Sequence, residues 1–411
     1  MVNRPNHIAT GRQSSLFEED VSRQTANLKQ ALSASRVCVI GGAGSIGSAT
    51  LSLLLGYDIG ELVVIDHNEN GLANLTRRIQ AAPIRPKARQ ITTLPFDYGS
   101  DIAHHFFNDH GHFDYVLNFA ALKHVRSEKD VYSALALIDT NVLKPTHLLS
   151  WLADANPKAS YFSVSTDKAA NPVSFMGATK RLMEHAMFGS GHAEQLKGRK
   201  VSARFANVAY SNGSLLESFL QRLEARVPLA APVGISRYFI TEEEAGQLCL
   251  MAGILGKDGD ILFPKLSPED HLVPVEDIAR KFLEANGYEA DVFTLDEQDD
   301  ASASLEKLAA ENKWPLILTP ADTAGEKPFE EFVGEGEKTH LTDFDELYAI
   351  KYGSHLTGSE IDVSLERLES LVLGDHDDTL SLDLLKSIIS DLEPRFAESH
   401  KASTKRLDDR I

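Results

Sequence analysis

The sequence predicts an α/β protein with a doubly wound parallel sheet, a smaller second lobe after it, and helical extensions at both ends. Two observations support this fold class. Short apolar segments alternate with helical stretches between residues 36 and 208, which is the pattern of strands and crossover helices in a parallel sheet. From Ser211 onward, glycines and prolines interrupt this alternation, so we expect a separate and less regular lobe there.

The composition limits the class of protein. Of the 411 residues, 43% are hydrophobic and 25% are charged, as in ordinary globular proteins. No apolar run approaches the roughly 20 residues that span a bilayer, and residues 1–30 contain no apolar signal core. The two cysteines, Cys38 and Cys249, lie in apolar runs, which fits a reducing compartment. Because the net charge of −19 also opposes nucleic-acid binding, we expect a cytoplasmic protein with no membrane insertion and no nucleic-acid partner.

The first strand, residues 36–40, runs into a glycine-rich turn and then an apolar helix. The turn has the spacing G-x-x-G-x-x-G, which permits a tight turn and lets the backbone approach a pyrophosphate at the helix N-terminus. Because a second strand and an acidic residue follow it, the pattern predicts a Rossmann-type dinucleotide site. The expected cofactor contacts in this turn are Gly41, Gly44, Ser45, Ile46 and Gly47.

The second strand, residues 61–65, ends in Asp66. An acid at about this distance from the glycines hydrogen-bonds the adenosine ribose. Its charge would repel a 2′-phosphate, and the next residue, His67, is not an arginine. The sequence therefore favours NAD over NADP as the cofactor, with Asn68 as a further contact.

Later strands are expected to complete the cofactor site. A third strand, residues 90–94, precedes a polar pair that can face the adenine. A fourth strand, residues 115–121, ends in small residues that let a cofactor pass closely, and the next helix carries an asparagine. The residues expected at these three places are Asp97 and Tyr98, Ala120 and Ala121, and Asn141.

Functional groups concentrate where a central strand, residues 160–165, gives way to a helix. Thr166, Asp167 and Lys168 follow the strand directly, and Lys180 lies in the helix. Ligands bind at the carboxyl ends of strands in open parallel α/β sheets, so this stretch is the predicted active site. An ordinary polar loop with Asp167 as a helix cap is the competing interpretation.

Four parts are predicted along the chain: an N-terminal arm (1–35), a NAD-binding Rossmann domain (36–210), a substrate-binding lobe (211–340) that can return strands to the main sheet, and a helical C-terminal extension (341–411). Residues 287–314 are acidic and predict a variable surface excursion. Because the arm and the extension are amphipathic and lie outside the catalytic core, we expect them to help build a homo-oligomer from dimers.

Several motifs together resemble one family. They include Gly-Gly-Ala-Gly-Ser-Ile-Gly at 41–47, Ser-Thr-Asp-Lys-Ala-Ala-Asn-Pro at 165–172, Met-Gly-Ala-Thr-Lys-Arg at 176–181 and Gly-Glu-Lys at 325–327. Over about residues 36–335 the chain resembles the nucleotide-sugar (UDP-N-acetylglucosamine) 4,6-dehydratases of the polysaccharide-biosynthesis group, within the extended short-chain dehydrogenase/reductase superfamily. Met176 stands where most of that superfamily has the tyrosine of Tyr-x-x-x-Lys, as in a recognised subgroup of these dehydratases.

The resemblance implies a lyase that makes a 4-keto-6-deoxy sugar for bacterial surface glycans. NAD would take a hydride from sugar C4, and the resulting ketone would acidify the C5 proton. A base would then remove that proton while an acid helps the C6 hydroxyl leave as water, and the hydride would return to C6. The substrate would be a UDP- or GDP-N-acetylhexosamine, most simply UDP-N-acetylglucosamine.

The acid and the base of this reaction would be Asp167 and Lys168. Asp167 must then be protonated and Lys168 neutral, and burial is expected to shift both pKa values in those directions. A positive Lys180 is expected to help keep Lys168 neutral and to reach the nicotinamide ribose. Because Met176 cannot titrate, Thr166, relayed to a neighbour or water, is the candidate base for the C4 hydroxyl.

The resemblance also implies a substrate side near the sugar and the diphosphate, where arginine suits bidentate phosphate contact. A surface salt bridge is the competing role for these residues, and packing is favoured over catalysis for the histidine among them. No spacing suggests metal ligands. The substrate-side residues are Lys123, His124, Asn207, Ser214, Arg237 and Glu326, the last of these at a nucleotide ribose.

Two other functions compete with the dehydratase. A nucleotide-sugar epimerase would share the fold and the transient 4-ketone, but it needs no acid at C6, so Asp167 and Lys168 argue against it. A non-catalytic NAD-binding sensor or scaffold would explain the missing tyrosine but not the full set of polar groups. Loss of water, unchanged product mass, or no turnover would separate the three.

Overall fold

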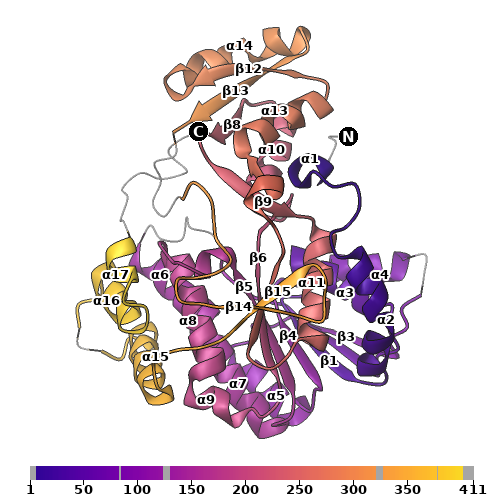
Figure 1. The fold of residues 1–411 in the computed structure, drawn as a ribbon, viewed down its shortest axis with the longest axis vertical. Helices are drawn as coiled ribbons and strands as arrows, with labels where there is room; N and C mark the ends of the chain where they lie inside the picture. The colour runs from indigo at the N-terminus through magenta and orange to yellow at the C-terminus, as the bar shows by residue number, and fades with distance from the viewer. Residues whose placement is uncertain (1–5, 83–84, 124–129, 321–326, 377, 401–411) are drawn as a thin grey trace.

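A nine-stranded sheet runs through the computed structural model, which describes residues 6–82, 85–123, 130–320, 327–376 and 378–400 (Figure 1). The strands from β10 to β3 are all parallel, and β15 and β14 extend one edge in antiparallel pairing. The predicted α/β class is therefore confirmed. In spatial order the strands are β14 (Thr339–Leu341), β15 (Leu347–Lys351), β10 (Asp260–Pro264), β6 (Lys200–Phe205), β5 (Ser160–Thr166), β4 (Tyr115–Asn118), β1 (Arg36–Ile40), β2 (Glu61–Ile65) and β3 (Gln90–Leu94).

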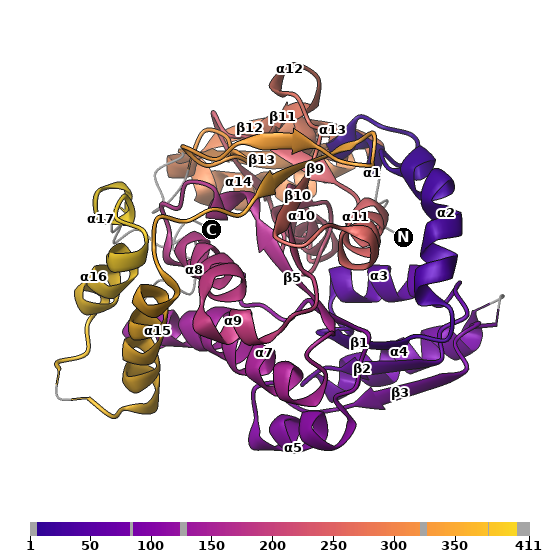
Figure 2. The same ribbon diagram turned by 60° about the horizontal axis from the view of Figure 1, so that its bottom comes forward.

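Both faces of the main sheet are buried. Successive residues along one strand point alternately into two apolar layers, one on each face. In β1, Val37 and Val39 pack on one side, while Cys38 and Ile40 pack on the other. Nearly continuous apolar strands are expected where helices cover both faces. One layer contains α2 (Glu18–Leu32), α3 (Ser45–Leu54), α4 (Glu69–Ala81) and α11 (Glu242–Leu255), and the other contains α5 (Asp101–His110), α7 (Lys144–Ala155), α8 (Phe175–Gly189) and α9 (Gly191–Gln195) (Figure 2).

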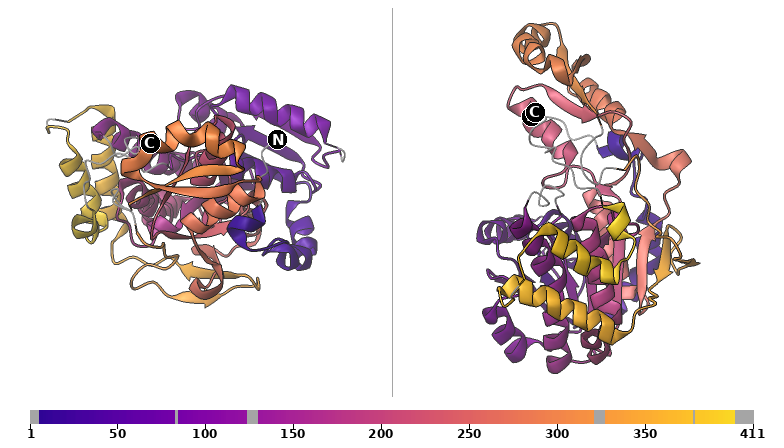
Figure 3. Two further views of the ribbon diagram at one scale, coloured as in Figure 1. Left: turned by 90° about the horizontal axis from the view of Figure 1, so that it is seen from above. Right: turned by 90° about the vertical axis from the view of Figure 1, so that its left-hand side faces the viewer.

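The second lobe is built on a separate parallel sheet and projects from the end of the main sheet (Figure 3). Its strands occur in the order β12 (Glu289–Thr294), β13 (Lys313–Thr319) and β8 (Leu229–Pro232). The helices α10 (Leu215–Glu224), α13 (Val275–Ala285) and α14 (Gln298–Ala310) contribute to its apolar core. A small sheet of β11 (Leu272–Pro274), β9 (Ser236–Ile240) and β7 (Asn207–Val208) lies between this lobe and the main sheet.

The acidic stretch 287–314, expected as a surface excursion, instead contributes a β-α-β unit to this lobe. Strand β12, the short 3₁₀ turn η4 (Leu295–Glu297), helix α14 and strand β13 follow one another along the chain. Leu305 and Trp314 are buried in the lobe core. The acidic residues of α14 lie on its exposed side. Composition alone therefore did not predict that the other side of this helix is buried in the lobe.

The described parts of both terminal segments pack against the core of the same chain. From the arm, α1 (Asn6–Thr10) contacts the second lobe, and α2 packs on α11. The extension first adds β14 and β15 to the sheet, and then α15 (Gly358–Leu373), α16 (Leu382–Leu392) and α17 (Phe396–Ser399) cover α6 (Val131–Ile138) and α8 on the opposite side of the molecule (Figures 1 and 2). The amphipathic patterns are thus satisfied within one chain, and the homo-oligomer stays a prediction. Among the described residues, no helix has the length and apolarity that a membrane crossing requires.

The docking of α15 can be tested by truncating one buried leucine. Leu368 is fully buried, whereas Leu373 on the same helix is 72% exposed. We expect Leu368→Ala to lower the free energy of unfolding by about 2–5 kcal/mol, because it removes buried methyl groups and leaves a cavity. Leu373→Ala is the control and should change it by less than about 0.5 kcal/mol. Equal effects in denaturant titrations would show that α15 is not docked as described.

Candidate active site

The glycine-rich turn joins β1 to α3 and lies against the end of β4. Gly41 has a φ of +74°, and a Cβ there would lie 2.6 Å from the Ala120 nitrogen. A Cβ at Gly47 would lie 2.3 Å from the Gly41 oxygen, so neither position accepts a larger residue. At Gly44 a Cβ would meet only the Gly41 oxygen, at 3.4 Å. The turn is therefore closely packed at Gly41 and Gly47 but has free space at Gly44, just before α3. A bound pyrophosphate needs such space at the start of the helix.

Asp66 lies at the end of β2 and is 8% exposed. One of its carboxylate oxygens accepts a hydrogen bond from the Ala43 nitrogen, at 2.9 Å, and the other accepts one from the Asn68 nitrogen, also at 2.9 Å. The carboxylate thus fixes the glycine-rich turn and retains acceptor capacity for a hydroxyl. The Asn68 side chain caps α4 by accepting from the Gly71 nitrogen.

Tyr98 and Asp97, which were predicted to face the adenine, make contacts within the protein itself. Tyr98 is buried and donates its hydroxyl proton to the Thr140 carbonyl, at 2.6 Å. Asp97 pairs with Lys144, at 2.6 Å. Of these two side chains Asp97 is the more exposed.

Asn141 holds the end of β4 against α8. It lies in the π-helical turn η2 (Asp139–Leu143) and is fully buried. Its side chain bonds both the nitrogen and the carbonyl of Leu122, at 3.0 and 2.9 Å, and also donates to the Thr179 hydroxyl. The segment that contains Ala120 and Ala121 is therefore fixed relative to α8.

Thr166, Asp167 and Lys168 meet at the carboxyl end of β5, in the 3₁₀ turn η3 (Asp167–Ala169) and just before it. Asp167 is 2% exposed. Its Oδ1 accepts from the Thr166 hydroxyl, at 2.8 Å, and from the Lys168 ammonium, at 3.0 Å. Its Oδ2 is buried and has no partner among the described residues. One oxygen of the predicted acid is thus left without a hydrogen bond from the part of the chain that the structure describes.

The expectation that burial keeps Lys168 neutral is wrong. Burial does oppose its ammonium form, but the negative charges of Asp167 and Glu330 outweigh that effect and raise the pKa of Lys168. Arg237, rather than Lys180, is the cation that opposes this rise.

Glu330 is a residue of this site that the sequence analysis missed. It is 4% exposed, and its Oε1 lies 3.8 Å from the Lys168 Nζ. Burial and the nearby charge of Asp167 raise the pKa of Glu330, while Lys168 and Arg237 lower it. The paired glutamates after residues 325–327 were visible in the sequence, but no local pattern shows which of the two is buried.

Met176 and Lys180 both lie on the buried side of α8, with exposures of 4% each. The Lys180 ammonium donates to the Val164 carbonyl of β5, at 2.9 Å. Burial lowers the pKa of Lys180 to about 8, although Glu184 opposes the shift. Lys180 therefore connects α8 to β5, the strand whose carboxyl end leads to Asp167.

The residues predicted on the substrate side differ in their surroundings: some bond to the backbone of the protein, and one is exposed. Arg237 donates to the carbonyls of Lys327 and Pro328 and so holds the chain that leads to Glu330. Asn207 donates to the Tyr238 carbonyl, Ser214 caps α10, and Lys123 is exposed. Two further predictions, His124 and Glu326, lie outside the described residues.

Directly behind this site lies a buried ion cluster. Arg204 of β6 is fully buried and makes paired bonds to Glu184 of α8, at 2.9 and 2.6 Å, and to Glu337, at 2.5 and 2.9 Å. Ser165 donates to Glu184, at 2.6 Å. Burial opposes ionisation of Glu184, but the surrounding arginines lower its pKa to about 2. Arg181 joins Glu184 and Glu337 to Glu393 of the C-terminal extension, at distances of 3.0, 2.8 and 2.7 Å.

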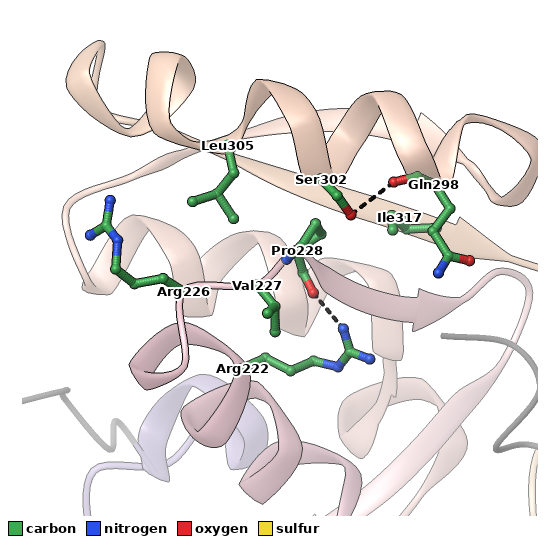
Figure 4. Close-up of a pocket in the computed structure, with 8 residues that line it drawn as sticks. All are labelled: Arg222, Arg226, Val227, Pro228, Gln298, Ser302, Leu305 and Ile317. Carbon is green, nitrogen blue, oxygen red and sulfur yellow. Dashed lines mark hydrogen bonds between the residues drawn. The ribbon is translucent and has the colours of Figure 1, made fainter.

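A cavity of about 260 Å³ lies elsewhere, in the second lobe between α10, α14 and β13 (Figure 4). None of the predicted site residues lines it. Its lining consists of Arg222, Arg226, Val227, Pro228, Gln298, Ser302, Leu305 and Ile317. Within the described part of the chain, no cluster of His, Cys, Asp and Glu side chains could hold a metal ion.

Comparison with known proteins identifies similar chains. A family model described as polysaccharide biosynthesis protein matches residues 37–352. The chain is 25% identical over 286 residues to the probable polysaccharide biosynthesis protein EpsC of Bacillus subtilis (strain 168), covering 66% of this chain and 44% of EpsC. It is 30% identical over 236 residues to the UDP-glucose 4-epimerase of Rickettsia canadensis (strain McKiel), covering 55% of this chain and 65% of that enzyme. The chain thus spans less than two thirds of either relative.

A similar fold occurs in the X-ray structure of Pen from Bacillus thuringiensis. The TM-score is 0.63 at 21% sequence identity, and the alignment covers 84% of this chain and 98% of Pen. At this identity the likeness concerns the fold alone.

The buried ion cluster can be tested by removing its central cation. Arg204→Ala leaves Glu184 and Glu337 without their main partner, so we expect the free energy of unfolding to fall by about 3–5 kcal/mol. Arg226→Ala is the matched control, because its pair with Glu306 is exposed and such pairs contribute little. Similar denaturation curves for the two variants would contradict a structural role for the cluster.

Proposed function

Because the chain belongs to the polysaccharide biosynthesis protein family, we propose that it is a nucleotide-sugar 4,6-dehydratase. The substrate is a UDP-N-acetylhexosamine, most simply UDP-N-acetylglucosamine, and NAD is the resident cofactor. The observation that carries the proposal is the Asp167 carboxylate, which has one oxygen bonded to Thr166 and Lys168 and a second, buried oxygen without a partner among the described residues. A substrate hydroxyl is the group that this second oxygen fits.

The residues around the glycine-rich turn fit NAD. Backbone space at Gly44 and the tight positions at Gly41 and Gly47 suit a pyrophosphate at the start of α3, and Asp66 favours a free ribose hydroxyl over a 2′-phosphate. When bound, NAD would supply the hydride chemistry that oxidises sugar C4 and later reduces C6. Lys180 lies beside β5 and can orient the nicotinamide ribose.

Thr166 gives the C4 hydroxyl a route for its proton despite the absence of a tyrosine at Met176. The Thr166 hydroxyl already donates to Asp167 Oδ1, at 2.8 Å. It can therefore receive the proton of the C4 hydroxyl while passing its own proton to Asp167. In this scheme Asp167 receives that proton during the oxidation, so the oxidation itself converts Asp167 into the acid.

Asp167 and Lys168 then divide the elimination between them. Asp167 gives its proton to the C6 hydroxyl, which leaves as water. Lys168, whose ammonium first releases a proton to solvent on its exposed side, takes the proton from C5. Lys168 later returns a proton to C5 when C6 is reduced. The atoms balance: the lost water consists of the C6 hydroxyl and the proton that came from the C4 hydroxyl, and the cofactor is regenerated.

An epimerase is the second candidate, because a relative with 30% identity is a UDP-glucose 4-epimerase. Epimerisation at C4 requires only the oxidation step and its reversal on the other face of the sugar. Thr166 and Lys180 would suffice for that chemistry. Epimerisation needs no acid or base at C5 or C6, so it leaves the contact between Asp167 and Lys168 without a role. For this reason we favour the dehydratase.

The proposal predicts different defects for the residues of the site. Lys168→Ala should slow water loss by about 10²–10⁴-fold, as expected when a general base is removed, but should still oxidise C4. Substrate should then produce a reduced-nicotinamide absorbance that does not decay. Asp167→Asn should slow both steps, because it can neither receive the C4 proton nor protonate C6.

Stopped-flow absorbance and product mass spectrometry measure the two steps separately. Lys158→Ala is the control, because Lys158 is exposed and lies before the same strand. Near-normal water loss by both Lys168→Ala and Asp167→Asn would remove this pair from the mechanism.

A further inference from the structure

We propose that Glu330 is a positioning residue that holds the Lys168 ammonium and determines when Lys168 becomes available as a base. The inference rests on the proposed function for its catalytic meaning, because Lys168 is the C5 base only in a dehydratase. The contact between the two side chains stands independently of that function.

Lys168 lies between two buried carboxylates. Its Nζ is 3.0 Å from Asp167 Oδ1 and 3.8 Å from Glu330 Oε1. Asp167 and Glu330 are 2% and 4% exposed, whereas the Lys168 side chain is 24% exposed. Besides these carboxylates, the charged groups that act on this cluster are Arg237 of β9 and Lys327.

Glu330 is held in place by the segment that carries it. We call residues 327–337 the strap. At its start, the Lys327 ammonium donates to the Asn171 carbonyl, at 2.6 Å, and Arg237 donates to the Lys327 carbonyl, at 2.9 Å. At its end, Glu337 is bonded to Arg204 in the buried ion cluster.

Close packing fixes the middle of the strap as well. A Cβ at Gly334 would lie 2.3 Å from the Ala170 oxygen, so the strap touches the backbone just after Lys168. The Glu335 nitrogen also donates to the Asn171 side chain, at 3.1 Å. Glu330 is therefore fixed from both sides, and its carboxylate faces Lys168 as part of the built site.

The pKa of Lys168 depends on the charges of Asp167 and Glu330, and the charge of Asp167 changes during the reaction. While both are ionised, they stabilise the ammonium and raise the pKa of Lys168. When Asp167 receives the C4 proton through Thr166, its charge is neutralised, and of these two carboxylates only Glu330 stays negatively charged beside the ammonium. The pKa of Lys168 then falls, so the base becomes available after C4 has been oxidised.

The first test measures the Lys168 proton directly. Acetic anhydride labelling of the full-length protein, followed by peptide mass spectrometry at a series of pH values, reports the midpoint at which Lys168 becomes a reactive amine. Glu330→Gln should move this midpoint down by about 1–3 pH units, the usual effect of an opposite charge at this range. Glu330→Asp keeps the charge and should stay closer to the wild-type midpoint.

Glu331→Gln is the matched control. Glu331 lies on the same strap, is exposed, and bonds Asn171 rather than Lys168. It should leave the midpoint unchanged. A wild-type midpoint in Glu330→Gln, or an equal shift in Glu331→Gln, would overturn the inference.

The second test connects the contact to catalysis. In Glu330→Gln the rising limb of the kcat–pH profile for water loss should move to lower pH, while the rate of C4 oxidation stays near wild type. A protein that merely lost packing would show a lower rate with an unmoved profile, which contradicts the inference.

The two proposals fail in different ways. If the wild-type protein removes no water from any nucleotide sugar while the labelling shift is present, the proposed function fails and the assignment of Glu330 to Lys168 stands. If the wild-type protein removes water but neither the labelling midpoint nor the pH profile changes in Glu330→Gln, the inference fails and the proposed function stands.

Discussion

The buried guanidinium of Arg204 is the constraint on which the site depends. An unpaired charge in the interior costs several kcal/mol, so Arg204 must keep both Glu184 and Glu337 beside it. These three residues come from β6, from α8 and from the end of the strap. Because Glu184 also accepts from Ser165, the strand that leads to Asp167 and the strap that carries Glu330 have fixed positions relative to each other.

This arrangement brings a partly exposed lysine together with two buried carboxylates. Lys168 meets Asp167 from its own strand end and Glu330 from a segment that follows far later in the chain. The C-terminal extension reaches the same cluster, since Glu393 bonds both Arg181 and His185. The helices after the sheet therefore support α8, and with it Met176 and Lys180. The polar groups of the site are therefore already oriented by the fold, as electrostatic catalysis requires.

Local patterns predicted the parts of this protein that depend on neighbouring residues. The glycine-rich turn, the strand that ends in Asp66 and the polar run at Thr166–Lys168 are all contiguous in sequence, and the structure has them at strand ends as expected. Glu330 and the pairing of Arg204 with Glu337 were missed because they depend on contacts between residues more than a hundred positions apart. The neutral state expected for Lys168 failed because the negative charges of Asp167 and Glu330 together outweigh burial. Asp167 is adjacent in sequence, but the contribution of Glu330 could not be inferred locally. Strand β13 was hidden by the acidic helix before it, because composition does not show which side of a helix is buried.

The central claim is that this chain removes water from a nucleotide sugar through Asp167 and Lys168. The most direct measurement is the product mass after incubation of the protein with UDP-N-acetylglucosamine and NAD in deuterated water. The account predicts a sugar nucleotide lighter by one water, with one solvent-derived deuterium at C5, because Lys168 is partly exposed and exchanges its proton before returning one. A product with the mass of the substrate and no deuterium at C5 would contradict the account and indicate an epimerase.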